Sequence, residues 1–363
     1  MAERCIMEKE LSAQEHNVQS KEHYAYLVNS LIDAFNAGDL PSVEKITVEP
    51  KYGYIATIKY VTGENRVIYG HDPGLNPGSS EELVKDKGYT KFILKENGIN
   101  CPEGDEFLLP WWAETLRTSD RQQYNSVIQD TSGAHLFIQE NLHYPVYIKP
   151  SRGSQGVGVT RISDEQELYE AFNVFNQERV KVALVEEELT MPDYRLLVFN
   201  GELVNAYERQ PLSVTGNGSS TVEQLIHQKH TELLEQGRDI HMDQQRPLIE
   251  KKLGKLGLSL NIVIASGDNV QLLDISNLSA GGTPVDVMNT IHPHWARLAG
   301  DIAKIFNLRV CGVDLACSDI TSGQSEYSVI EVNATPGAKQ FMATGQGEQE
   351  RLKKLFTDFF ATP

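Results

Sequence analysis

Two short segments near the C-terminal end of the chain alternate apolar with polar or small residues, which predicts two β-strands, 310–316 (VCGVDLA) and 327–333 (YSVIEVN). Side chains two positions apart on a strand share a face, so Glu331 and Asn333 point the same way. Asp314 reaches the same place if the two strands pair. Three oxygen ligands on a rigid sheet, with other coordination positions open, suit a Mg²⁺ ion that carries nucleotide phosphates. The alternative is a solvated strand face, which these two segments alone favour.

Hydrophobic periodicity along the rest of the chain predicts a mixture of helices and strands, and therefore an α+β fold. Further strands are predicted at 44–48, 54–61, 66–69, 144–150, 159–162, 181–185, 194–198, 202–207, 261–265 and 270–273. Helices are predicted at 23–35, 80–97, 163–175, 220–257, 295–306 and 352–359. Gly88 is expected to split the second helix, because glycine costs a helix interior about 1 kcal/mol relative to alanine. The Gly- and Ser-rich segment 212–220 is expected to be mobile.

A glycine-rich segment follows a predicted strand that ends in a lysine. Lys149 and Pro150 close the strand, and residues 151–158 (SRGSQGVG) come next. This loop lies between two strands, so it is neither a Walker loop nor a dinucleotide fingerprint, each of which opens a helix. Its backbone N–H groups can still fold over phosphates, because glycines leave them unobstructed. A simple hairpin turn is the alternative, but it does not explain an unpaired lysine at the end of an apolar strand.

Three other segments place polar groups at the ends of predicted elements. The helix at 80–97 carries several lysines, most of which suit a solvated face, and Lys87 follows Asp86. The strand at 181–185 runs into the acidic linker 186–193 (EEELTMPD). In the loop 274–282 (DISNLSAGG), amide and backbone donors are expected near the sheet edge from Asn277, Gly281 and Gly282.

The composition narrows the class of partner. The 363-residue chain is 40% hydrophobic and 23% charged, with a formal net charge of −17. This excess of carboxylates argues against nucleic acid or an anionic membrane as a partner, although an anionic nucleotide needs only local positive charge. No apolar run approaches the ~20 residues of a membrane helix, and the charged first residues form no signal peptide. The cysteines lack metal-ligand spacing and are expected as reduced thiols, which favours a cytoplasmic protein.

Five strings in order resemble motifs of the ATP-grasp superfamily: 193–198 (DYRLLV), 208–211 (ERQP), 215–218 (TGNG), 277–282 (NLSAGG) and 331–337 (EVNATPG). The lysines, the glycine loop, the acidic linker and the three oxygen ligands also fall in the superfamily's order and approximate spacing. The resemblance covers roughly residues 80 to 345. Within the superfamily, the chain is most similar to the ligase part of cyanophycin synthetases and to bacterial glutathione synthetases, including their bifunctional relatives.

The resemblance implies a nucleotide site. Lys87 and Lys149 would contact the α- and β-phosphates, with Lys91 as the substitute for Lys87. The β- and γ-phosphates would be covered by the loop residues Gly153, Ser154, Gln155, Gly156 and Gly158. Adenine would be lined, partly through backbone groups, by Glu186, Glu187, Glu188 and Leu189. Asp193 would bond the ribose hydroxyls with its two acceptor oxygens.

The resemblance also implies the metal and catalytic residues. Asp314, Glu331 and Asn333 would hold two Mg²⁺ ions, with Mn²⁺ as an alternative. Arg195 and Arg209 would meet the γ-phosphate and the substrate carboxylate, because guanidinium forks suit both. Several relatives have an arginine two residues before the metal aspartate, where this chain has Gly312. Oxyanion stabilisation is therefore expected from Arg209 or from the loop that contains Asn277.

The function implied is that of an ATP-dependent carboxylate–amine ligase of the acid–amino-acid type. It would join an amino acid or short peptide to an amine through an acyl phosphate, with a γ-glutamyl amide as one candidate product. The Mur-ligase-like half of cyanophycin synthetase is absent from the sequence, which argues against repetitive two-amino-acid polymerisation. One alternative is a small-molecule kinase that stops at phosphoryl transfer. Another is a nucleotide-binding module without turnover, which predicts a broken metal set, whereas all three ligands are present.

The expected organisation is an ATP-grasp fold whose two α+β lobes clamp ATP. Residues 1–80 would form a short N-terminal α+β segment, and 81–187 the first lobe with the glycine loop. Residues 188–363 would form the second lobe with the metal site and a helical insertion near 212–257. A homodimer or homotetramer is expected from the relatives.

Overall fold

The computed structural model describes residues 18–120, 123, 128–153, 157–236, 238, 240, 242–337 and 346–363. Their contacts divide the chain into two compact units, 1–76 with 335–363, and 77–334. Among the described residues, no helix is long and apolar enough to cross a membrane. The α+β class predicted from the sequence is confirmed.

The first unit is a three-stranded antiparallel sheet with two helices. Its strands β1 (Val43–Val48), β2 (Ile55–Tyr60) and β3 (Asn65–Tyr69) pair in that order. Strands β2 and β3 bury alternate residues, whereas β1 buries Val43 and Ile46. Helix α12 (Gln346–Ala361) packs against α2 (Tyr26–Ala37). Because of these contacts α12 belongs with the N-terminal segment, whereas the sequence grouped it with the second lobe.

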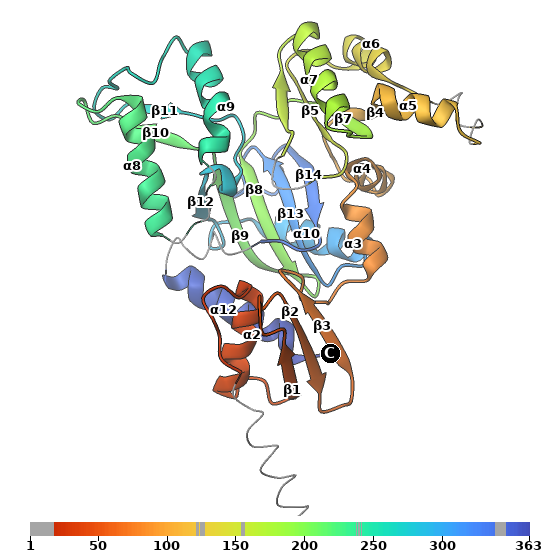
Figure 1. Ribbon diagram of the computed structural model, residues 1–363, viewed down its shortest axis with the longest axis vertical. Helices are drawn as coiled ribbons and strands as arrows, with labels where there is room; N and C mark the ends of the chain where they lie inside the picture. The colour runs from red at the N-terminus through yellow and green to blue at the C-terminus, as the bar shows by residue number, and fades with distance from the viewer. Residues whose placement is uncertain are drawn as a thin grey trace, which may run out of the picture. The chain divides into compact units, whose positions relative to one another are not determined.

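The larger unit contains a five-stranded antiparallel sheet in the order β12-β9-β8-β13-β14 (Figure 1). The strand bounds are β12 (Thr283–Asp286), β9 (Glu202–Gln210), β8 (Asp193–Phe199), β13 (Val310–Cys317) and β14 (Tyr327–Asn333). Helix α10 (Pro293–Ile305) packs on one face of this sheet and fills the core with residues such as Trp295 and Ile302. The other face is therefore left for polar side chains.

A second sheet of this unit has the order β4-β7-β5-β6. Its strands are β4 (Gly104–Leu108), β7 (Val182–Glu187), β5 (Val146–Pro150) and β6 (Thr160–Ile162). Helices α6 (Thr131–Asn141) and α7 (Glu165–Gln177) pack on it, and α5 (Pro110–Arg117) follows β4 (Figure 1). The glycine loop connects β5 to β6, as the sequence predicted.

Helices α3 (Gly78–Val84) and α4 (Lys87–Glu96) replace the single helix predicted at 80–97. The break is not at Gly88, which lies in the first turn of α4. It falls at Lys85 and Asp86, because the Asp86 side chain accepts a hydrogen bond from the backbone N–H of Tyr89 and so starts a new helix. This start places Lys87 at the first position of α4.

The insertion between β9 and β12 forms a small substructure with its own hydrophobic cluster. Strand β10 (Ser213–Thr215) pairs with β11 (Asn269–Gln271), and helices α8 (Val222–Glu235) and α9 (Met242–Lys255) lie between them in the chain. The segment predicted to be mobile thus contains a paired strand. The strand predicted at 261–265 is reduced to an isolated bridge between Val263 and Thr221.

Candidate active site

The polar face of the five-stranded sheet carries a row of charged side chains, named here the charged row: Arg209, Asp193, Arg195, Asp314 and Glu331. The strand register builds it directly. Asp193 lies opposite Arg209, Arg195 lies opposite Asp314, and Asp314 lies opposite Glu331. Residues that are directly opposite on antiparallel strands share a face. The pairing of 310–316 with 327–333, on which the sequence argument depended, is confirmed.

Ion pairs connect the members of the charged row. Arg195 binds Asp314 with two guanidinium nitrogens, one of them, Nη2, at 3.0 Å from Oδ2. Arg209 Nη2 lies 2.7 Å from Asp193 Oδ1 and 3.0 Å from Asp314 Oδ2. Asp314 is 2% exposed, so these charges interact where little water screens them. Burial raises the pKa of Asp193 to about 6, against the lowering effect of the Arg209 guanidinium.

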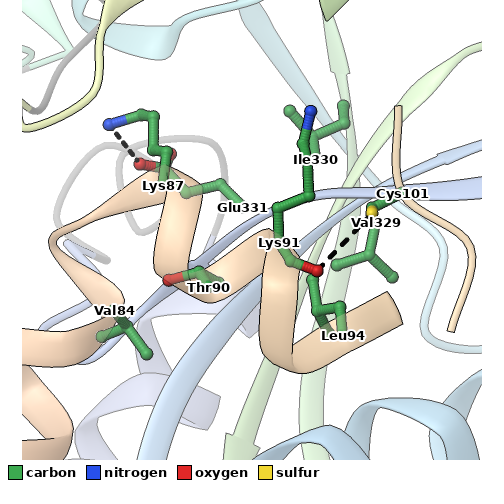
Figure 2. A pocket seen from close by; sticks show the side chains of 9 residues that line it. All are labelled: Val84, Lys87, Thr90, Lys91, Leu94, Cys101, Val329, Ile330 and Glu331. Carbon is green, nitrogen blue, oxygen red and sulfur yellow. Dashed lines mark hydrogen bonds and ion pairs between the residues drawn. The ribbon is translucent and has the colours of Figure 1, made fainter. Parts of the chain in front are cut away.

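Lys87 connects the charged row to the glycine loop. Its Nζ donates to the carbonyl of Gly153 at 2.8 Å and lies 3.1 Å from Glu331 Oε1. Figure 2 shows this ion pair beside α4, in a small pocket that Lys91, Cys101 and Glu331 also line. The structure thus brings together two residues that are far apart in the chain, the lysine predicted to contact phosphate and the carboxylate predicted to bind the metal.

Lys149 and Lys91 share the buried carboxylate of Glu186. Lys91 Nζ lies 2.5 Å from Glu186 Oε1, and Lys149 Nζ pairs with Oε2. Burial by itself would raise the pKa of Glu186, but the two ammonium groups outweigh it and hold the pKa below its usual value. The Glu186 side chain therefore contacts two lysines, and only its backbone remains to line adenine. From the sequence, Lys91 was predicted only as a substitute for Lys87, and its contact with Glu186 was not predicted.

Two other residues predicted to line adenine have polar partners in the structure. Glu188 forms a bidentate pair with Arg161, and Glu187 accepts a hydrogen bond from the backbone of Glu103. Leu189 is the second residue after the end of β7. Of the glycine loop, Ser154, Gln155 and Gly156 lie outside the described residues. Gly158 has a φ of 75°, and an added Cβ would meet the Pro150 ring at 2.9 Å, so this position requires glycine.

The loop from Asn277 to Gly282 does not offer the backbone donors that the sequence predicted. The N–H groups of Gly281 and Gly282 donate to the carbonyls of Leu278 and Asn277. The Asn277 side chain caps the short helix η2 (Leu278–Ala280) by accepting from Ser279. These hydrogen bonds occupy the backbone N–H groups of residues 279–282, so these groups are not available for an oxyanion.

Comparison with known proteins identifies the family. A model of the RimK-like ATP-grasp domain matches residues 116–240 and 274–353, more than half of the chain. The chain belongs to the RimK-like ATP-grasp family. It is 35% identical over 274 residues to a cyanophycin synthetase of Geminocystis herdmanii, covering 73% of this chain and 29% of that protein. It is 28% identical over 289 residues to a bifunctional glutathione biosynthesis protein of Clostridium perfringens, covering 76% of this chain and 34% of that protein.

A solved structure has a similar fold. The bifunctional glutathione synthetase of Pasteurella multocida gives a TM-score of 0.54 at 23% identity, over 92% of this chain and 44% of that one. The chain spans about a third of the length of the curated relatives it matches. The resemblance to ATP-grasp proteins predicted from the sequence is therefore confirmed, and the family is one of ATP-dependent ligases.

The chemistry of the predicted metal ligands suits a magnesium ion, although Asp314 is paired with two arginines and Glu331 with Lys87 in this structure. Among the described residues, no three His, Cys, Asp or Glu side chains are grouped to hold a metal. The predicted set differs, because it has two carboxylates and one amide oxygen on neighbouring strands. Asn333 turns its Nδ2 toward Glu331 Oε2 at 3.4 Å, which leaves its Oδ1 for another contact. All three are hard oxygen donors, the kind that Mg²⁺ takes.

Proposed function

We propose that this protein is an ATP-dependent carboxylate–amine ligase that forms an amide through an acyl phosphate and releases ADP and phosphate. The charged row carries this proposal, because it gathers two arginines and three carboxylates on one sheet face beside Lys87. Such a set can neutralise phosphates, hold a substrate carboxylate and ligate a divalent ion. The family supports the ligase class, and the substrates are our inference.

Each residue of the row has a role in this proposal. Asp314, Glu331 and Asn333 would hold Mg²⁺, which would supply charge neutralisation on the transferring phosphoryl group. Lys87 and Lys149 would contact the α- and β-phosphates, leaving the carboxylates that pair with them in the structure. The backbone of 186–189 would line adenine, and Asp193 would accept hydrogen bonds from the ribose.

The two arginines would act on the reacting groups. Arg195 would orient the γ-phosphate, and Arg209 would hold the substrate carboxylate in line with it, because each guanidinium presents paired donors. The carboxylate oxygen attacks the γ-phosphorus and ADP leaves. The amine then attacks the acyl carbon, and phosphate leaves. The glycine loop would exclude water from the acyl phosphate.

The substrate class is inferred as amino acids or short peptides, in keeping with relatives named as cyanophycin synthetase and glutathione biosynthesis protein. A γ-glutamyl amide is one product that such a site could form. Arg209 is the residue that would recognise the carboxylate to be activated.

We expect ADP release to require both a carboxylate and an amine. Activation without an amine would leave an acyl phosphate bound, so steady turnover needs the second substrate. The measurement is phosphate release across a panel of amino acids and dipeptides with MgATP, with mass spectrometry of products. ADP release with one acceptor and a stable phosphorylated product would instead identify a kinase. Nucleotide binding without release in any combination would identify a binding module.

A further inference from the structure

Arg238, in the connection between α8 and α9, is a buried cation that does not belong to the charged row. It is 3% exposed, and its Nη2 donates to the carbonyls of Leu278 at 2.8 Å and Gly282 at 2.7 Å. Within the described part of the chain it has no carboxylate partner, and its Nε makes no hydrogen bond. Burial lowers the pKa of Arg238, yet a guanidinium stays charged at neutral pH. A buried charge is costly unless it is paired or hydrogen-bonded, so the two carbonyls are the contacts that compensate this cost.

The two carbonyls that Arg238 binds lie near the two ends of one loop. Leu278 begins η2, and Gly282 is the last residue before β12. An added Cβ at Gly282 would meet three backbone carbonyl oxygens, of Gln210, Ser276 and Asn277, at 2.8–3.0 Å. The loop is therefore packed directly on the end of β9, and one guanidinium ties both of its ends together.

The loop continues directly into the edge of the five-stranded sheet. Thr283 lies opposite Gln210, and Pro284 lies opposite Arg209. Arg209 is the member of the charged row that would hold the substrate carboxylate. A shift of the loop would thus be passed to the strand beside Arg209, whereas Lys87 and Lys149 stand on other elements.

We infer that Arg238 is a positioning residue, which fixes the loop 277–282 and strand β12 beside Arg209 and so orders the substrate end of the site. This inference rests on the proposed function. It predicts a selective effect of replacing Arg238: the carboxylate substrate should bind more weakly, while nucleotide binding should stay unchanged. A displacement of about 1 Å at a reacting group can cost about 100-fold.

The test compares three variants of the full-length protein. Arg238→Met removes the donors at similar length, and Arg238→Lys keeps a charge and can still donate to both carbonyls. Arg246→Met is the matched control, because Arg246 is an exposed arginine of the same insertion, paired with Glu223 and Glu250. Steady-state constants are measured for MgATP and for the carboxylate found active in the substrate panel. Hydrogen exchange of the peptide 276–283 reports on the loop without any substrate.

In Arg238→Met we expect the KM for the carboxylate to rise about 10- to 100-fold, while the KM for MgATP stays within about twofold. In Arg238→Lys the KM for the carboxylate should rise less than in Arg238→Met, and in Arg246→Met both KM values should match those of the wild type. Exchange of 276–283 should be faster in Arg238→Met alone. An unchanged carboxylate KM, or equal losses for both substrates without rescue by lysine, would overturn the inference. If the wild type releases no ADP with any pair of substrates, the proposed function is overturned. In that case, unchanged exchange of 276–283 in Arg238→Met would show that Arg238 does not fix the loop.

Discussion

Glu331→Ala is expected to lower the rate of ADP release at least about 10³-fold while the protein stays folded. The proposed magnesium would lose one of its carboxylates, and a bound metal supplies several kcal/mol of charge stabilisation in phosphoryl transfer. The fold should survive, because the Glu331 side chain is 22% exposed and contacts Lys87 and Asn333 at the sheet surface. The measurements are ADP release and the thermal unfolding midpoint.

Glu326→Ala is the matched control, because Glu326 is an exposed acid in the turn that leads into β14. It should leave both quantities unchanged. Calorimetric titration of Mg²⁺ with a non-hydrolysable ATP analogue gives a second measure, in which Glu331→Ala should bind the ion more weakly than Glu326→Ala. Turnover and Mg²⁺ binding at wild-type levels in Glu331→Ala would refute the metal assignment.

One part of the charged row, the meeting of Asp314 with Glu331, could be predicted because it depends only on the strand period, whereas Asp193, Arg195 and Arg209 were expected from the resemblance to ATP-grasp proteins. Asp314 and Glu331 sit on short strands joined by a polar loop, and antiparallel pairing of neighbouring strands then brings them together. The sequence placed Asp193 in the linker, whereas it is the first residue of β8, two positions before Arg195 and on the same face. A contact that follows from the alternating pattern of two neighbouring strands could therefore be predicted from the sequence.

Contacts between distant elements could not be predicted in this way. The run VALVEE of β7 reads as an apolar strand that emerges into a polar linker, and nothing in it indicates that Glu186 turns inward to two lysines. Strand β12 was missed because Pro284 argues against a strand, yet β12 is an edge strand, where proline is tolerated. The amphipathic face of α12 predicts burial, but does not indicate which unit it packs against.

Glu186→Gln is expected to lower the free energy of unfolding at pH 7 by about 3–5 kcal/mol, the usual cost of removing one partner of a buried ion pair. Glu186 is 4% exposed, and the substitution would leave Lys91 and Lys149, both buried, without their shared counter-charge. Urea denaturation measures the change. Glu103→Ala is the control, since the Lys95–Glu103 pair is exposed and should contribute no more than about 1 kcal/mol.

The pH dependence of this loss separates a charge effect from a packing effect. The folded pKa of Glu186 is below its ordinary value of 4.5, so the folded state binds its proton less readily than the unfolded state does. The stabilisation is therefore fully present above about pH 4.5 and disappears as the pH falls through the folded pKa. The difference between wild type and Glu186→Gln should shrink in the same direction. A difference that stays constant down to acid pH would mean that Glu186 stabilises the sheet through its shape and hydrogen bonds, and that the two lysines do not depend on its charge.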